Sequence, residues 1–131
     1  MDKKPKFIFI LDRSWSMEDF GRMEIALEAL KLFLISLPAE CHFQIISFGS
    51  SHQWQDHKRE LIEYNDQNLQ RIKQEIAGSR NNFLGGTEIY APLKELYEHK
   101  TKPEYQNQHW NVFLLTDGAV SDRERVIDLI R

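Results

Sequence analysis

The sequence has little cysteine and no long apolar run. Cys41 is its single cysteine, which excludes an internal disulfide framework and suits a small buried residue. The apolar run Phe7 to Leu11 is too short for a signal sequence or a membrane span. We therefore expect no membrane insertion, and the single cysteine without a leader favours a cytoplasmic location.

The sequence also lacks an excess of positive charge. Its 17 Lys and Arg residues face 20 Asp and Glu residues, which leaves a net charge of −3. This balance argues against the basic surface of a nucleic-acid-binding domain. A length of 131 residues, 41% hydrophobic and 28% charged, is ordinary for a globular protein. We expect residues 1–131 to form a single domain around one core.

Three short apolar runs predict buried β-strands. They cover residues 7–11, 43–48 and 112–115, and each ends in a polar or glycine turn. A run that is apolar on both faces is typical of a central parallel strand with helices on each side. A short extended piece near Trp54 is expected at the edge of the sheet, with Trp54 and Trp110 as packing residues at strand ends.

Helical patterns lie between and after these runs. Hydrophobic residues recur at steps of three and four over 22–37, 66–77 and 89–99, and Pro38 ends the first helix. A capping-box pattern at 121–124 predicts a fourth helix. Residues 99–109 look most like a loop. The alternation predicts an α/β fold, a doubly wound and mostly parallel sheet with helices on both faces.

Five oxygen-bearing residues are expected to meet at one edge of this sheet. The first strand ends in a D-x-S-x-S pattern made by Asp12, Ser14 and Ser16, the third ends before Asp117, and a loop carries Thr87 after two glycines. Ligands bind beyond the carboxyl ends of the strands in open α/β sheets. The glycines would let the backbone bring Thr87 close.

These residue types suit a hard divalent cation. Carboxylate and hydroxyl oxygens favour Mg²⁺ or Mn²⁺, and Mg²⁺ usually keeps several waters, which leaves open positions. If Asp12 and Asp117 lay ~5 Å apart, their repulsion at an effective dielectric of ~20 would be roughly 3 kcal/mol, and a bound cation would reverse its sign.

At this point the sequence resembles the von Willebrand factor type A domain family. The resemblance rests on FIFILDRSWSM, the helix EIALEALKLFLISLP, and the stretches FQIISFGS, GGTEIYAPL and VFLLTDG. The sequence of these stretches is most similar to the type A domains of inter-alpha-trypsin inhibitor heavy chains and their intracellular relatives.

The resemblance implies a metal-ion-dependent adhesion site. In it Ser14, Ser16 and Thr87 would offer hydroxyl oxygens, and Asp12 and Asp117 would act directly or through water. A Glu or Asp of a partner protein would then complete the coordination. The family is mostly not catalytic, so we expect a protein–protein interaction module and no enzyme.

The sequence departs from the family pattern in two places. Trp15 stands where glycine is frequent, and its indole would either restrict access to the ion or anchor a partner. Type A domains usually continue beyond the helix that follows Asp117. The domain is therefore expected to be truncated at its C-terminal end, as part of a larger polypeptide or complex, with an uncovered sheet edge.

Three alternatives remain open. The site residues could serve only as turn formers and helix caps without a metal. The domain could be a structural subunit of a larger assembly, with its metal site idle or empty. A phosphohydrolase with Asp12 as nucleophile is more distant, because such sites usually pair the acid with a second one and serines stand here.

The scattered histidines, His52 among them, have no zinc spacing and are expected to face solvent or cap elements.

Overall fold

The computed structural model of the protein describes residues 5–55, 61–79, 81, 83–86, 89–100 and 110–115, with the backbone alone at 99 and 100. Five strands form one sheet: β1 (Lys6–Asp12), β2 (His42–Phe48), β3 (His52–Trp54), β4 (Ile62–Glu63) and β5 (Trp110–Leu115). Their order is β3-β2-β1-β5, with β4 also paired to β2. Strand β1 runs parallel to β2 and β5, whereas β3 and β4 are antiparallel to β2. The mostly parallel α/β sheet is confirmed.

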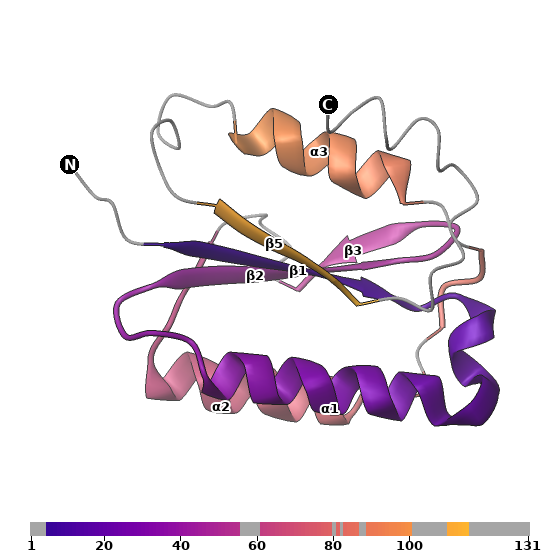
Figure 1. Cartoon of the computed structure of the whole chain (residues 1–131), viewed down its shortest axis with the longest axis horizontal. Coiled ribbons are helices and arrows are strands. Elements are labelled where there is room, and N and C mark those ends of the chain that lie inside the picture. Colours follow the sequence, from indigo (N-terminus) through magenta and orange to yellow (C-terminus); the bar gives the residue numbers. More distant parts are fainter. Residues whose placement is uncertain are drawn as a thin grey trace.

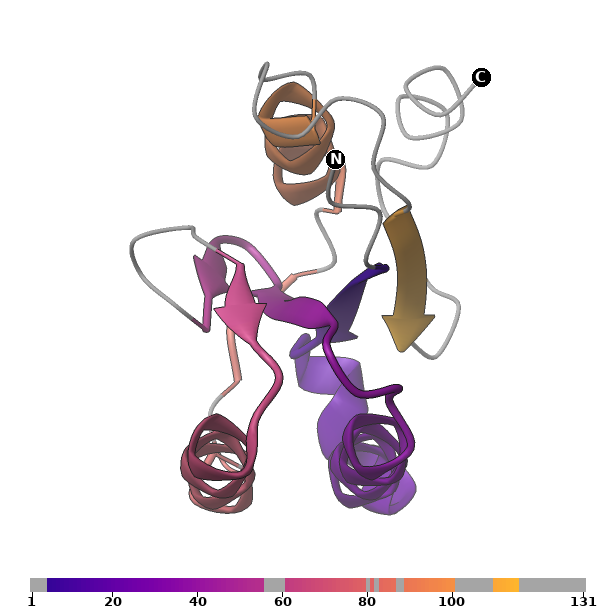
Figure 2. The same ribbon diagram turned by 90° about the vertical axis from the view of Figure 1, so that its left-hand side faces the viewer.

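Three helices cover the two faces of the sheet. They are α1 (Arg22–Ile35), α2 (Asp66–Ala77) and α3 (Tyr90–Lys100). Helices α1 and α2 lie side by side on one face and α3 lies on the other (Figure 1). The end-on view in Figure 2 shows these three layers, with β5 at one edge of the sheet. The order of strand, helix and strand thus gives the doubly wound arrangement predicted from the hydrophobic pattern.

Strand β1 is apolar on both faces because it separates two cores. Phe9 and Leu11 belong to the core under α1 and α2, whereas Ile8 and Ile10 belong to the core under α3. All four are at most 1% exposed. Successive side chains of a strand point to opposite faces, so one run fills both cores. This burial fixes the register that places Asp12 at the carboxyl edge.

Three of the four predicted helices are confirmed, with small differences at their ends. Helix α1 stops two residues before the predicted end at Leu37, and α2 begins and ends as predicted. The Asn65 side chain caps α2 by accepting a hydrogen bond from the backbone of Asn68 at 2.8 Å. Phe33 shares the helical spacing of the apolar residues of α1, yet it is 40% exposed and stacks on Phe113 of β5.

Two short elements have no counterpart in the predictions. They are β4 and the 3₁₀ segment η1 (Trp15–Gly21). The edge strand near Trp54 is confirmed as β3. Helix α3 extends one residue beyond its predicted end at His99, to Lys100, which was expected in the loop. The remainder of that loop and the capping box at 121–124 lie outside the described residues.

Within the described residues, no helix is long and apolar enough to cross a lipid bilayer. Cys41 is fully buried just before β2, as the sequence predicted. Trp54 is 3% exposed and Trp110 packs against the same core under α3, so both are packing residues as expected.

Candidate metal centre

The carboxyl ends of three parallel strands meet at one edge of the sheet. Asp12 ends β1 and stands opposite Phe48, the last residue of β2, while Leu11 stands opposite Leu115, the last residue of β5. This edge lies at the right-hand end of Figure 1, where η1 leads into α1. Ligand sites of open α/β sheets lie at this position.

Three of the five predicted ligands lie together in one turn at this edge. The backbone N–H of Ser14 donates a hydrogen bond to the Asp12 carboxylate at 2.8 Å. The Ser14 and Ser16 hydroxyl oxygens lie 3.0 Å apart. Asp12 is 0% exposed and Ser14 is 1% exposed. The turn therefore gathers a carboxylate and two hydroxyl groups within a few residues. Thr87 and Asp117 lie outside the described residues.

The segment that leads to Thr87 is fastened to this turn through its backbone. Leu84 donates its backbone N–H to the carbonyl of Arg13 at 2.7 Å, and Trp15 donates its N–H to the carbonyl of Gly85 at 2.8 Å. Ser14 and Gly85 form a parallel bridge between these segments. Two backbone hydrogen bonds thus hold residues 13–15 against the loop that carries the glycines.

Gly85 must be glycine for two reasons. Its φ of +90° lies in a region that side-chain-bearing residues rarely adopt, and a Cβ atom there would lie 2.8 Å from the Ser50 hydroxyl. That hydroxyl accepts a hydrogen bond from the backbone N–H of Gly86 at 2.8 Å. Gly85 therefore permits the close approach of this loop to Ser50, whereas the prediction that the glycines bring Thr87 close to the ion falls on a residue outside the described ones.

Arg13 is a functional residue that sequence reasoning missed. Its guanidinium donates to the Ser47 hydroxyl at 2.9 Å, and to the Ser79 carbonyl and hydroxyl at 2.8 Å each. Arg13 is 3% exposed, and this burial lowers the pKa of its guanidinium. The side chain ties the Asp12–Ser14 turn to β2 and to the C-terminal end of α2. No local pattern reveals it, because its partners are 34 and 66 residues away.

The second serine of the pattern is supported from α1. Arg22 donates from its guanidinium to the carbonyl of Ser16 at 3.0 Å. The backbone N–H of Met17 donates to the carbonyl of Ser14 at 3.0 Å, which begins the 3₁₀ segment. Met17 is 2% exposed and belongs to the core under α1 and α2. The backbone that carries the two hydroxyls is therefore held by hydrogen bonds to the carbonyls of Ser14 and Ser16.

The oxygen donors at this turn fit a hard cation better than a soft one. Within the described residues, no three His, Cys, Asp or Glu side chains gather in a way that could hold a metal. Zinc takes its ligands mainly from sulfur, imidazole and carboxylate groups. Hydroxyl and carboxylate oxygens such as those of Ser14, Ser16 and Asp12 instead suit Mg²⁺ or Mn²⁺.

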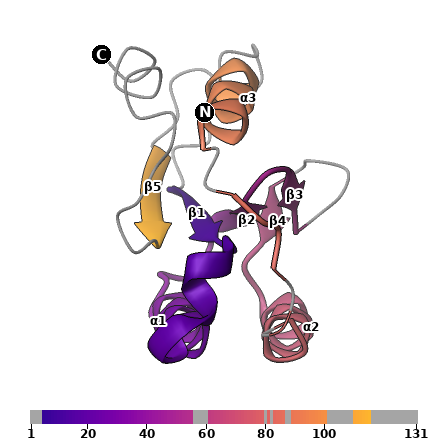
Figure 3. The same cartoon turned by 90° about the vertical axis from the view of Figure 1, so that its right-hand side faces the viewer.

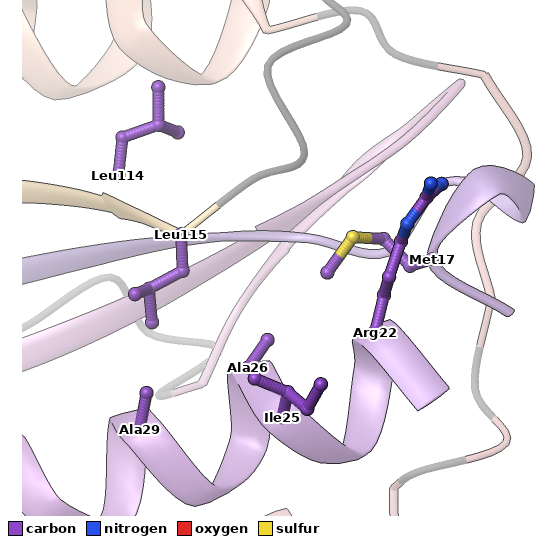
Figure 4. A pocket seen from close by; sticks show the side chains of 7 residues that line it. All are labelled: Met17, Arg22, Ile25, Ala26, Ala29, Leu114 and Leu115. Atoms are coloured by element: carbon purple, nitrogen blue, oxygen red, sulfur yellow. The ribbon is translucent and has the colours of Figure 1, made fainter. Parts of the chain in front are cut away.

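An apolar cavity of about 460 Å³ lies beside the site, between α1 and the end of β5. It is lined by Met17, Arg22, Ile25, Ala26, Ala29, Leu114 and Leu115. In Figure 4, the Leu115 side chain points toward α1, on the face where Ala26 and Ala29 lie. Arg22 is the one charged residue among the described residues of this lining.

One prediction for the histidines was wrong. His52, on β3, hydrogen-bonds through Nε2 to a carboxylate oxygen of Glu95 on α3 at 2.6 Å. Its side chain is 20% exposed, so it neither faces solvent freely nor caps an element. The contact fastens the edge strand to the helix above it.

The fold agrees with the comparisons with known proteins. Residues 6–131 match the model of the von Willebrand factor type A domain, and the chain belongs to that family. A von Willebrand factor A domain-containing protein of Dictyostelium discoideum is 36% identical over 130 residues, which cover 98% of this chain and 13% of that protein. Human von Willebrand factor A domain-containing protein 5A is 37% identical over 134 residues, which cover 96% of this chain and 16% of that protein.

Solved structures share the fold. A von Willebrand factor type A protein from Catenulispora acidiphila superposes with a TM-score of 0.69 at 20% identity, over 84% of this chain and 26% of that one. The type V pilus tip protein Mfa5 of Porphyromonas gingivalis gives a TM-score of 0.62 at 14% identity, over 83% of this chain and 19% of that one. The chain spans about a seventh of the length of the Dictyostelium discoideum and human relatives. The placement near inter-alpha-trypsin inhibitor heavy chains stays a prediction.

Proposed function

We propose that this protein is a protein–protein interaction module that depends on a divalent cation and has no enzymatic activity. Asp12, Ser14 and Ser16, together with Thr87 and Asp117, would hold Mg²⁺ or Mn²⁺ with an unfilled coordination position. A Glu or Asp side chain of a partner protein would occupy that position.

The turn at the end of β1 is the observation that carries this proposal. A fully buried carboxylate, that of Asp12, lies in the same turn as two hydroxyls that are 3.0 Å apart. Burying a carboxylate is costly unless other groups compensate its charge. A bound divalent cation would supply that compensation and would use both hydroxyls, so the donor set supports a metal site.

The surroundings of Asp12 support binding rather than phosphoryl transfer. Ser14 and Ser16 stand where phosphotransfer sites usually place a second acid. The Asp12 carboxylate also accepts the backbone N–H of Ser14, which holds it in the turn.

Calorimetry with Mg²⁺ and Mn²⁺ on chelator-stripped protein tests the metal site. The wild-type protein should bind either ion saturably, and Asp12→Ala should lose this binding while its circular dichroism spectrum is retained. Asp19→Ala is the matched control, because Asp19 is an exposed acid on η1, close in sequence to the turn. Retention of metal binding by a folded Asp12→Ala variant would disprove the assignment.

A structural subunit is the second candidate, and one observation favours it. Val112, Phe113 and Leu114 on β5 are 38–46% exposed, next to the apolar cavity. Such a surface suits packing against other polypeptide in an assembly. Asp117→Ala separates the two functions, because only the metal-dependent module would lose partner binding in that variant.

A further inference from the structure

We propose that Trp15 and Phe83 form an aromatic contact site beside the metal turn. The site would receive an aromatic side chain that neighbours the acidic residue of the partner. This inference rests on the proposed function, since it names the kind of partner segment that the metal site would take.

The two rings form a fixed platform. Their centroids lie 5.4 Å apart with an interplanar angle of 23°, so the indole is stacked on Phe83. The backbone N–H of Trp15 is bonded to the carbonyl of Gly85. The hydrogen bond fixes the backbone of Trp15 and the stacking holds its indole on one face, yet Trp15 remains 61% exposed. A rigid, exposed indole loses little conformational freedom when a partner covers it.

The platform lies where a partner carboxylate would approach. Trp15 separates the two serines of the turn in sequence, and its indole extends toward Gly85. A Cβ atom at Gly85 would lie only 3.9 Å from the indole nitrogen. The indole therefore lies within van der Waals reach of the loop that leads to Thr87. A carboxylate that reaches the ion would pass beside the exposed ring.

The negative charge around the platform favours a partner segment that also carries a positive charge. Glu18 and Asp19 follow on η1 and are exposed, and within the described part of the chain neither carboxylate takes part in an ion pair. An acidic partner segment would be repelled by them unless it also carried a basic residue. The segment that fits best has an aromatic residue, then Asp or Glu, with Lys or Arg close by.

Two synthetic peptides test this inference. One is acetyl-Gly-Phe-Asp-Gly-Lys-amide, and the other has Ala in place of Phe. Their affinities are measured by calorimetry on protein saturated with Mn²⁺, after each variant's affinity for Mn²⁺ has been determined. The wild-type protein should bind the Phe peptide about tenfold more tightly, as expected for one buried aromatic anchor.

Variants of two exposed aromatic residues complete the test. Trp15→Ala should bind both peptides equally, whereas Trp15→Phe should keep part of the preference because its ring can still stack on Phe83. Phe20→Ala is the control that should keep the whole preference. Phe20 is 88% exposed on the same segment, with the Arg22 guanidinium 5.4 Å from its ring centroid.

The outcomes separate this inference from the proposed function. Equal binding of the two peptides to the wild-type protein in Mn²⁺, or a preference that survives in Trp15→Ala, would overturn the aromatic contact site alone. If neither peptide binds in Mn²⁺, or if both bind equally well with chelator present, the metal-dependent function fails and this inference fails with it.

Discussion

The two edges of the sheet are built in opposite ways. Strand β3 is a three-residue antiparallel edge whose Trp54 is 3% exposed, and it is fastened to α3 by the His52–Glu95 hydrogen bond. Strand β5 is a six-residue parallel edge whose apolar side chains are 38–46% exposed at three positions. Figure 3 shows both edges in one view. A short edge with bonded polar side chains resists further pairing, whereas a long apolar one invites it.

The core under α1 and α2 is also better covered on its α2 side than on its β5 side. On the α2 side, Tyr64 donates its hydroxyl proton to the carbonyl of Leu34 at 2.6 Å. On the β5 side, Phe33 and Phe113 stack with centroids 5.6 Å apart but remain 40% and 38% exposed. Among the described residues, apolar side chains are therefore well buried toward α2 and β3 and partly exposed toward β5. Parallel strands are normally covered on both faces.

The largest expected effect contrasts aromatic residues of the two edges. Trp54→Ala should lower the free energy of unfolding by about 3 to 5 kcal/mol, because it empties a buried site. Phe113→Ala should cost about 1 to 2 kcal/mol, because that ring keeps part of its surface in water. Urea unfolding of both variants measures this contrast. Equal losses would show that β5 is as well packed as β3.

The next largest effect concerns the clamp on the closed side. Arg13→Met should lower the free energy of unfolding by about 2 to 3 kcal/mol, because it leaves Ser47 and Ser79 without their buried donor. It should also weaken Mn²⁺ binding by loosening the Asp12 turn. Arg22→Met is the comparison variant, since the Arg22 guanidinium donates to the Ser16 carbonyl and lies 5.4 Å from the centroid of the exposed Phe20 ring. Its loss should stay below about 1 kcal/mol.

A smaller effect is expected at Tyr64. Tyr64→Phe should cost about 1 kcal/mol, the net value of one hydrogen bond to a carbonyl. Burial raises the pKa of the Tyr64 hydroxyl above its ordinary value of 10.0. A raised pKa in the folded state means that the folded protein holds this proton more tightly, so stability is lost as pH rises above that value. The free energy of unfolding of the wild-type protein should therefore fall more steeply with pH above pH 10 than that of Tyr64→Phe. Urea unfolding at a series of pH values measures both.

The smallest effect on stability is expected from a charge on the open edge. Leu114→Lys should change the free energy of unfolding by less than about 0.5 kcal/mol, because Leu114 is 46% exposed. It should nevertheless reduce self-association, measured by light scattering against concentration, because a lysine blocks pairing at an edge strand. Gln53→Lys on β3 is the control and should change neither property. If self-association is the same in Leu114→Lys, the β5 edge is not its cause.

The sequence predicts the parts of this fold that depend on local pattern. Strands β1 and β2 are continuous apolar runs and helix α2 repeats a helical period, so their positions follow from the local sequence. Segment η1 and strand β4 carry no such period. They exist because of distant contacts, such as the pairing of Ile62 with Phe43, and pattern reasoning misses them.

The same limit divides the candidate site. The turn at Asp12 was predictable because its three polar residues are adjacent in sequence and follow a strand. The roles of Arg13 and His52 were not predictable. Each depends on a partner more than 30 residues away, and a charged or polar residue in a loop normally indicates solvent exposure. Folding alone brings such pairs together.

The position of Cys41 makes this protein convenient to label. It is the only cysteine of the sequence and is fully buried, and burial raises the pKa of its thiol. Maleimide and similar reagents attack the thiolate, so the folded protein should react slowly. A cysteine introduced at an exposed position, such as Gln53, could then carry a single fluorophore without removal of the native residue. Slow reaction of Cys41 itself would report how often the core opens.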